Sequence, residues 1–147
     1  HLVIRRQRQM CIRDSLLPGL LKLLASNRHH DLPQSVYELG AVVRDHRNAE
    51  RLAFITAERS GGFAAVRGRI QALCNDLGVK DWRAEPLEAG DGPWLAGRGA
   101  KILIGETWVG CFGELDPAVS SVYELRVPLN AAELDVDALM AAVSDPV

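Results

Sequence analysis

The chain of 147 residues is long enough to bury the core of one domain, and its 48% hydrophobic and 24% charged residues exclude a disordered chain. A net charge of −2 gives no broad attraction to nucleic acid or to membrane surfaces, and no apolar run has the length of a transmembrane helix or the pattern of a signal peptide. The three cysteines lie far apart, which disfavours a disulfide framework and favours a cytoplasmic location.

Residues 1–14 are basic, polar and poorly patterned, and we expect them to be an extension outside a core domain that spans residues 15–147. One interpretation is a basic arm that touches RNA, because four arginines face a single acidic residue in this segment. We favour a second interpretation, a fragment end with foreign sequence attached, because the chain begins at His1 and no periodic pattern starts before Ser15.

The first half of the core predicts two helices and three strands. Leucines spaced by three and four residues predict an amphipathic helix that starts near Ser15 and ends near Asn27. Residues 36–43 and 51–57 predict two strands joined by a polar connection. A second helix is predicted over 63–77, with Gly78 as a left-handed C-terminal cap, and a short strand follows over 81–86.

The second half predicts a hairpin over 100–115 that turns at Gly105-Glu106. Asp116 and Pro117 have the residue types that begin a short helix, and a last strand and a last short helix follow over 127–143. Neighbouring strands joined by short turns, with helices packed against them, predict an α+β fold with an antiparallel sheet.

Two segments suggest chemistry without completing a site. His29, His30 and Asp31 could belong to a metal or acid–base site, but the sequence has no second ligand cluster, and a solvated loop after the helix explains them better. Residues 97–102 (GRGAKI) suggest a glycine-rich phosphate-binding loop. They have neither the third glycine of the dinucleotide-binding motif nor the Gly-Lys-Ser/Thr ending of a P-loop. Both motifs also lead into a helix, whereas these residues precede a strand.

The remaining candidates are single residues. Cys74 lies on the apolar face of the second helix, and Cys111 has no neighbouring histidine that would activate it. Glu106, Glu114 and Asp116 group around the hairpin, but the last of these is better explained as a helix cap. We therefore expect no catalytic, cofactor-binding or metal-binding residues in this chain.

Three segments together resemble a known family. RDSLLPGLLKLLASNRHHDLPQSVYELGAVV, GGFAAVRGRIQALCNDLGV and GRGAKILIGETWVGCFGELDPAVSSVYELRVPLNAAELDVDAL occur in the order, and with the motifs, of the phenylalanyl-tRNA synthetase β subunit. They include the Arg-x-Ser-Leu-Leu-Pro-Gly-Leu-Leu, Phe-x-x-x-(Lys/Arg)-Gly and Gly-Glu-(Leu/Ile)-x-Pro patterns. The matches cover roughly residues 13–140.

The resemblance implies a class II aminoacyl-tRNA synthetase-like antiparallel sheet flanked by helices, in a subunit without working catalytic residues. In this family the α subunit uses ATP and Mg²⁺ to activate phenylalanine and attaches it to tRNA(Phe), within an (αβ)₂ heterotetramer. The resemblance favours an archaeal or eukaryotic type of β subunit, and it implies no cofactor for this segment.

The resemblance also predicts that the leucine-rich helix contributes to the interface with the α subunit. We expect this contact to involve Leu16, Leu17, Leu20, Leu23 and Leu24. The stripe of the helix includes Leu21 as well, whereas Leu16 and Leu23 lie off the stripe and should need a second partner surface.

Two alternatives remain. One is a stand-alone class II-like ligand-binding or regulatory paralogue without ligase activity. The other is an active enzyme domain, which would need an arginine on a strand to hold the α-phosphate of ATP. Arg44 and Arg51 flank the relevant region, but we place both in a polar connection rather than on strands.

Overall fold

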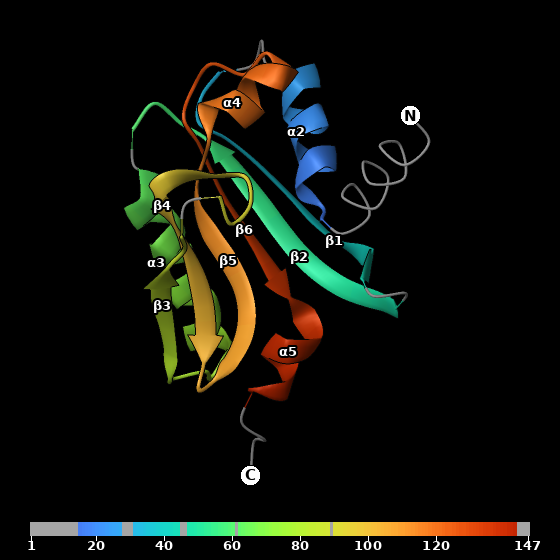
Figure 1. Ribbon diagram of the computed structural model, residues 1–147, viewed down its shortest axis with the longest axis vertical. Coiled ribbons are helices and arrows are strands. Elements are labelled where there is room, and N and C mark those ends of the chain that lie inside the picture. Colours follow the sequence, from blue (N-terminus) through green and yellow to red (C-terminus); the bar gives the residue numbers. More distant parts are fainter. Residues whose placement is uncertain (1–14, 28–30, 45–46, 61, 89, 144–147) are drawn as a thin grey trace.

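The computed structural model describes residues 15–27, 31–44, 47–60, 62–88 and 90–143, and six strands in this part of the chain form one antiparallel sheet (Figure 1). Their order across the sheet is β1-β2-β6-β5-β4-β3. The strands are β1 (Gln34–Arg44), β2 (Arg47–Ala57), β3 (Trp82–Pro86), β4 (Trp94–Ile104), β5 (Thr107–Leu115) and β6 (Leu129–Asp135). The predicted α+β fold with an antiparallel sheet is confirmed.

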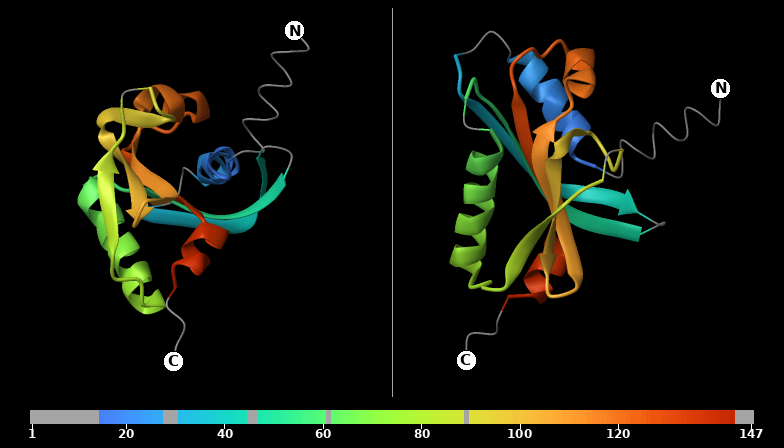
Figure 2. Two further views of the ribbon diagram at one scale, coloured as in Figure 1. Left: turned by 60° about the horizontal axis from the view of Figure 1, so that its bottom comes forward. Right: turned by 60° about the vertical axis from the view of Figure 1, so that its left-hand side comes forward.

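Two helices lie on opposite faces of this sheet (Figure 2). The helix α2 (Leu17–Ser26) packs against one face, and α3 (Gly62–Leu77) packs against the other. Three short elements complete the described fold: α4 (Pro117–Ser120), the 3₁₀ turn η1 (Ser121–Tyr123) and α5 (Val136–Ala141). Within the described residues, no helix is long and apolar enough to cross a membrane.

Each face of the sheet has its own hydrophobic core. The core under α2 contains the buried leucines of that helix together with Ala53, Ile55 and Ala131 from the middle of the sheet. The core under α3 contains Val66, Ile70 and Cys74 of the helix, as its predicted apolar face requires, with Phe112 and Leu134 from the sheet. Because side chains alternate along a strand, the central strands supply residues to both cores.

The hairpin of β1 and β2 is longer than predicted. We expected a polar connection over residues 44–50, but β1 runs to Arg44 and β2 starts at Arg47, and these two residues are paired across the hairpin. The expectation failed because exposed polar residues extend both strands beyond the core, where cross-strand pairing rather than burial maintains the ladder.

The hairpin of β4 and β5 turns at Gly105-Glu106 as predicted, with Ile104 opposite Thr107 and Gly105 at a φ of 61°. Residues 97–102, which we expected to precede the strand, lie inside it, because β4 already begins at Trp94. On the other side of β5, a Cβ atom at Gly110 would collide with the backbone carbonyl of Glu133. Glycine at this position therefore allows β5 and β6 to pair closely.

The predicted cap at Asp116 is present, and the structure adds a second one at Asp135. The Asp116 carboxylate accepts a hydrogen bond from the Ala118 N–H at 2.9 Å, at the start of α4. The Asp135 carboxylate accepts one from the Ala138 N–H at 3.0 Å, at the start of α5. At the end of α3, Gly78 has a φ of 76°, which confirms the left-handed cap.

Candidate functional site

The leucines of α2 are divided between the domain core and the surface. The predicted stripe is confirmed: Leu17, Leu20, Leu21 and Leu24 are each at most 4% exposed. Leu16, expected to lie off the stripe and to need a partner surface, is only 9% exposed and packs in the same core, where it faces Gly40 of β1. That expectation for Leu16 is wrong because its backbone is helical and its carbonyl accepts a hydrogen bond from the Leu20 N–H, so Leu16 lies one turn before Leu20 on the buried face.

Leu23 differs from the other leucines of this segment, with 45% of its surface exposed. Lys22 beside it is also exposed, so the outer side of α2 combines one large apolar side chain with a charge. Of the five leucines expected at a subunit interface, Leu23 is the one whose side chain is available to a partner. The interface itself stays a prediction.

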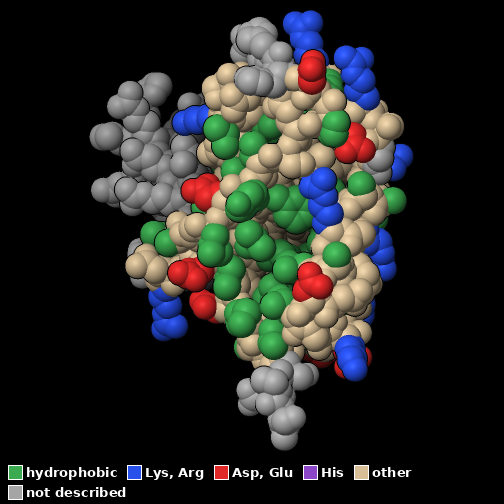
Figure 3. Space-filling model, turned by 180° about the vertical axis from the view of Figure 1, so that it is seen from behind, with side chains coloured by type: hydrophobic (Ala, Val, Ile, Leu, Met, Phe, Trp, Pro, Cys, Tyr) green, Lys and Arg blue, Asp and Glu red, His purple; other side chains and the backbone are tan. Residues whose placement is uncertain are grey.

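Strand β1 presents a second exposed apolar surface. Tyr37 is 78% exposed and Leu39 is 63% exposed, and Val43 of the same strand is 38% exposed. Tyr37 lies opposite Phe54 and Leu39 opposite Leu52 in the β1–β2 ladder, so these side chains share the face on which α3 lies. Figure 3, which views this face, shows hydrophobic side chains gathered over its middle.

The same strand forms one edge of the sheet. β1 pairs only with β2 among the described strands, so the outer side of an 11-residue strand has no described partner. Leu23 lies on the helix that covers one face beside this edge, and Tyr37 and Leu39 lie on the other face. The exposed apolar side chains thus flank the edge strand on both faces, and we call this surface the β1 edge surface.

A buried charged pair lies beneath the start of α2. Glu133 of β6 is 7% exposed and Arg51 of β2 is 4% exposed, and Glu133 Oε1 is 3.8 Å from Arg51 Nη1. Glu133 also accepts hydrogen bonds from the Ser15 hydroxyl at 2.7 Å and from the Leu16 N–H at 2.9 Å. The Arg51 guanidinium lies 5.4 Å from the centroid of the Trp108 ring.

This arrangement corrects the expectation for the two arginines. β1 ends at Arg44, and Arg51 is inside β2 rather than in a polar connection. Although Arg51 lies on a strand, as a phosphate-binding arginine would need to, it is buried and paired with Glu133. It therefore has no free guanidinium face to offer a nucleotide.

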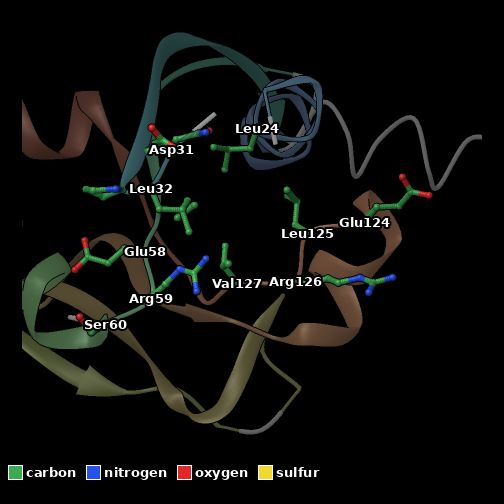
Figure 4. Close-up of a pocket in the computed structure, with 13 residues that line it drawn as sticks. Leu24, Asp31, Leu32, Glu58, Arg59, Ser60, Glu124, Leu125, Arg126 and Val127 are labelled. Atoms are coloured by element: carbon green, nitrogen blue, oxygen red, sulfur yellow. The ribbon is translucent and has the colours of Figure 1, made fainter. Parts of the chain in front are cut away.

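A cleft of about 870 Å³ opens at the end of the sheet where β1 starts and β2 ends (Figure 4). Its apolar lining includes Leu24, Leu32, Leu125 and Val127, which point toward one another in the close-up. Charged side chains stand around it: Asp31, Glu58, Arg59, Glu124 and Arg126.

The other sequence candidates do not converge on this cleft or on each other. His29 and His30 lie outside the described residues, so their assignment to a solvated loop stays a prediction; Asp31 is exposed. Glu106 is at the exposed β4–β5 turn, where its carboxylate is 3.7 Å from Arg83. In the described parts of the chain, no group of three or more His, Cys, Asp or Glu residues could hold a metal ion.

The two described cysteines occupy different environments. Cys74 is 2% exposed on the inner face of α3, and burial raises the pKa of its thiol above the ordinary value. A raised pKa keeps the thiol protonated, and a protonated thiol is a poor nucleophile. Cys111 is half-buried on β5. The prediction that Cys74 is a small core residue is confirmed.

Sequence reasoning missed Glu133 and the exposure of β1. Glu133 is the single charged residue in the buried stretch 129–134 of β6, and a charge among small and apolar neighbours is the signal that could have identified it. Tyr37 and Leu39 alternate as a strand requires, but alternation cannot tell whether a given face is covered by a helix.

The family comparison matches most of the chain. The profile of the phenylalanyl tRNA synthetase beta chain CLM domain matches residues 6–136, a range that begins inside the segment 1–14. Two curated relatives are phenylalanine–tRNA ligase beta subunits: one from Methanothrix thermoacetophila is 36% identical over 125 residues, and one from Archaeoglobus fulgidus is 39% identical over 127 residues. The matches cover 85% and 86% of this chain but 23% of each relative, so the chain spans about a quarter of their length.

A solved structure has the same fold. The pyrrolysyl-tRNA synthetase of Desulfitobacterium hafniense matches 86% of this chain and 48% of its own chain, with a TM-score of 0.74 and 12% sequence identity. This likeness confirms the class II aminoacyl-tRNA synthetase-like sheet flanked by helices. The profile match over residues 6–136 shows that the chain belongs to the phenylalanyl-tRNA synthetase β-chain family and corresponds to its CLM domain.

Proposed function

We propose that this chain is a catalytic-like structural part of a phenylalanine–tRNA ligase β subunit, and that its role is assembly with the α subunit in an (αβ)₂ heterotetramer. The α subunit performs the reaction, with ATP and Mg²⁺, and this chain contributes to the attachment of phenylalanine to tRNA(Phe) through the assembled enzyme. The complex works in the cytoplasm.

The distribution of exposed apolar side chains carries this proposal. Six large apolar side chains are exposed in the described part of the chain, and four of them belong to α2 and β1: Leu23, Tyr37, Leu39 and Val43. Large apolar side chains gathered around an unpaired strand edge favour an interface with another protein, because subunit interfaces bury such groups and pair such edges.

The chemistry of the sheet supports a non-catalytic role. Arg51, the strand arginine in the region where a phosphate-binding arginine was sought, is buried and paired with Glu133 inside the fold. We therefore expect the chain to form no phenylalanyl-adenylate when it is supplied with phenylalanine, ATP and Mg²⁺.

The cleft favours a second candidate function, that of a ligand-binding paralogue without ligase activity. Its mixture of apolar and charged lining residues is typical of small-molecule sites. Failure of the full-length β subunit to bind α, together with saturable binding of a small molecule that Arg59→Ala abolishes, would favour this candidate over the first.

The test of the leading proposal is the assembly of full-length β subunits with α. Leu23→Asp and Leu39→Asp each place a carboxylate in the β1 edge surface, where burial against a partner would leave it unpaired. We expect the double variant to shift the complex from heterotetramer to separate subunits in size-exclusion chromatography with light scattering.

A matched control is available in η1, a 3₁₀ turn that contacts α2 and is not part of β1. Val122 of η1 is 76% exposed and lies outside the β1 edge surface. Val122→Asp should leave the heterotetramer intact, and circular dichroism should show all variants folded. An intact heterotetramer in the folded double variant would rule out the β1 edge surface as the interface with α.

A further inference from the structure

Glu133 joins parts of the chain that are far apart in sequence. Its carboxylate accepts the Ser15 hydroxyl and the Leu16 N–H, 118 and 117 residues away, while the Arg51 guanidinium stands 3.8 Å from Oε1. Glu133 lies on β6, in the middle of the sheet between β2 and β5. A single side chain therefore ties the start of α2 to the most central part of the fold.

The start of α2 depends on this external carboxylate. The first turn of the helix contains no acidic residue, and Leu16, which precedes it, has no side chain that could cap it. The predicted cap, Ser15, accepts a hydrogen bond from the Leu17 N–H at 3.1 Å, and its hydroxyl donates one to Glu133 Oε2 at 2.7 Å. A negative charge at this end also interacts favourably with the helix dipole.

Arg51 makes the burial of this carboxylate tolerable. A buried carboxylate without a counter-charge is strongly unfavourable, and Arg51 supplies the charge from the adjacent strand. The Trp108 ring stands over the guanidinium and shields it. Arg51 Nε is buried with no hydrogen-bond acceptor among the described atoms, so the pair is only partly satisfied. Apolar side chains of similar volume in place of Arg51 and Glu133 would therefore stabilise the domain equally well. Stability alone does not explain why a charged pair occupies this position.

We propose that Glu133 is a positioning residue for subunit assembly: it anchors the N-terminal end of α2 to β6 and so sets the orientation in which α2 presents Leu23 beside the β1 edge. This inference rests on the proposed function. The acceptor oxygen for the Leu16 N–H performs the positioning, and Arg51 only balances the charge.

The test separates the acceptor from the charge, using two double variants of the full-length β subunit. Arg51→Met with Glu133→Gln removes both charges but keeps an amide oxygen for the Leu16 N–H, whereas Arg51→Met with Glu133→Ala removes the oxygen as well. We expect the alanine pair to bind α about tenfold more weakly than the glutamine pair, because one buried hydrogen bond is lost. The glutamine pair should bind α within about twofold of the wild type.

Hydrogen exchange on the β subunit alone distinguishes local anchoring of α2 from a general contribution of Glu133 to stability, which would change exchange throughout the domain. In the alanine pair, amides of residues 16–20 should exchange about tenfold faster than in the glutamine pair, while those of residues 66–74 in α3 should be unchanged. Glu133→Asp with Arg51 retained serves as a second variant. It keeps both charges but withdraws the carboxylate from the Leu16 N–H, so it should also loosen α2 and not α3.

Equal affinity of the two folded double variants for α would overturn the proposal, and so would equal loss of protection in α2 and α3 in every variant. If wild-type β does not bind α at all, the proposed function fails. Selective loosening of α2 would then still establish that Glu133 anchors the helix.

Discussion

The helices α2 and α3 each cover one face of the sheet, but they differ in length, in exposed apolar surface and in how their ends are held. α3 has 16 residues, and its buried positions, Val66, Ile70 and Cys74, recur every four residues while its outer face is polar. α2 has 10 residues, buries four leucines and still exposes Leu23. α3 ends in its own glycine cap, whereas the start of α2 is held by Glu133 from another element.

This difference indicates how the two layers are used. α3 requires nothing outside its own face of the sheet, as expected for a helix that only completes a core. α2 combines a complete inner stripe with an exposed leucine and an anchor from β6, and the unpaired edge strand runs beside it. Surplus apolar surface combined with a fixed orientation is what a subunit interface needs.

The largest expected effect distinguishes the inner from the outer leucines of the α2 segment. Leu16→Asp should cost about 3–5 kcal/mol of unfolding free energy, because it places an unpaired charge in the core. Leu23→Asp should change it by less than about 0.5 kcal/mol, since the side chain is already exposed. Urea denaturation measures both, and a loss with Leu23→Asp as large as with Leu16→Asp would show that Leu23 packs inside the domain.

Alanine substitutions at equally buried sites test whether the two cores contribute equally to the free energy of unfolding. Leu24 and Ile70 are each 1% exposed, so Leu24→Ala and Ile70→Ala should each cost about 2–5 kcal/mol. Leu73 is only half-buried, so Leu73→Ala should cost less than Ile70→Ala. If Leu24→Ala costs far less than Ile70→Ala in urea denaturation, then the α2 layer is loosely packed until a partner binds.

The smallest expected effect is a change in the pH dependence of stability, and it comes from the thiol of Cys74 in the α3 core. Burial raises the pKa of Cys74, so at alkaline pH the folded state holds a proton that the unfolded state releases. The stabilisation is complete below the unfolded-state pKa and decreases as the pH rises above it.

Thermal melts between about pH 7 and about pH 10 should therefore show a smaller decline in Cys74→Ala than in wild type. Parallel declines in the wild type and in Cys74→Ala would mean that Cys74 is not kept protonated by the α3 core.

The local sequence pattern predicted those elements well in which apolar residues recur at regular spacing or in which a turn or cap residue marks the end. The stripes of α2 and α3, the β4–β5 turn and the caps at Asp116 and Gly78 all depend on residues within a few positions of one another. The β1–β2 connection was predicted less well because Arg47–Glu50 are strand residues with a polar sequence, held by their partners in β1.

By itself, the sequence determined the α+β class, the order of its elements and the family resemblance, because hydrophobic period, turn residues and ordered motifs are local properties. Only the tertiary structure decided that Arg51 is paired with Glu133, that Leu16 is internal, and that Tyr37 and Leu39 are uncovered. These outcomes depend on which strands become neighbours and on how far each helix extends over a face. Contacts across more than a hundred residues, such as that between Leu16 and Glu133, leave no periodic signal in the chain.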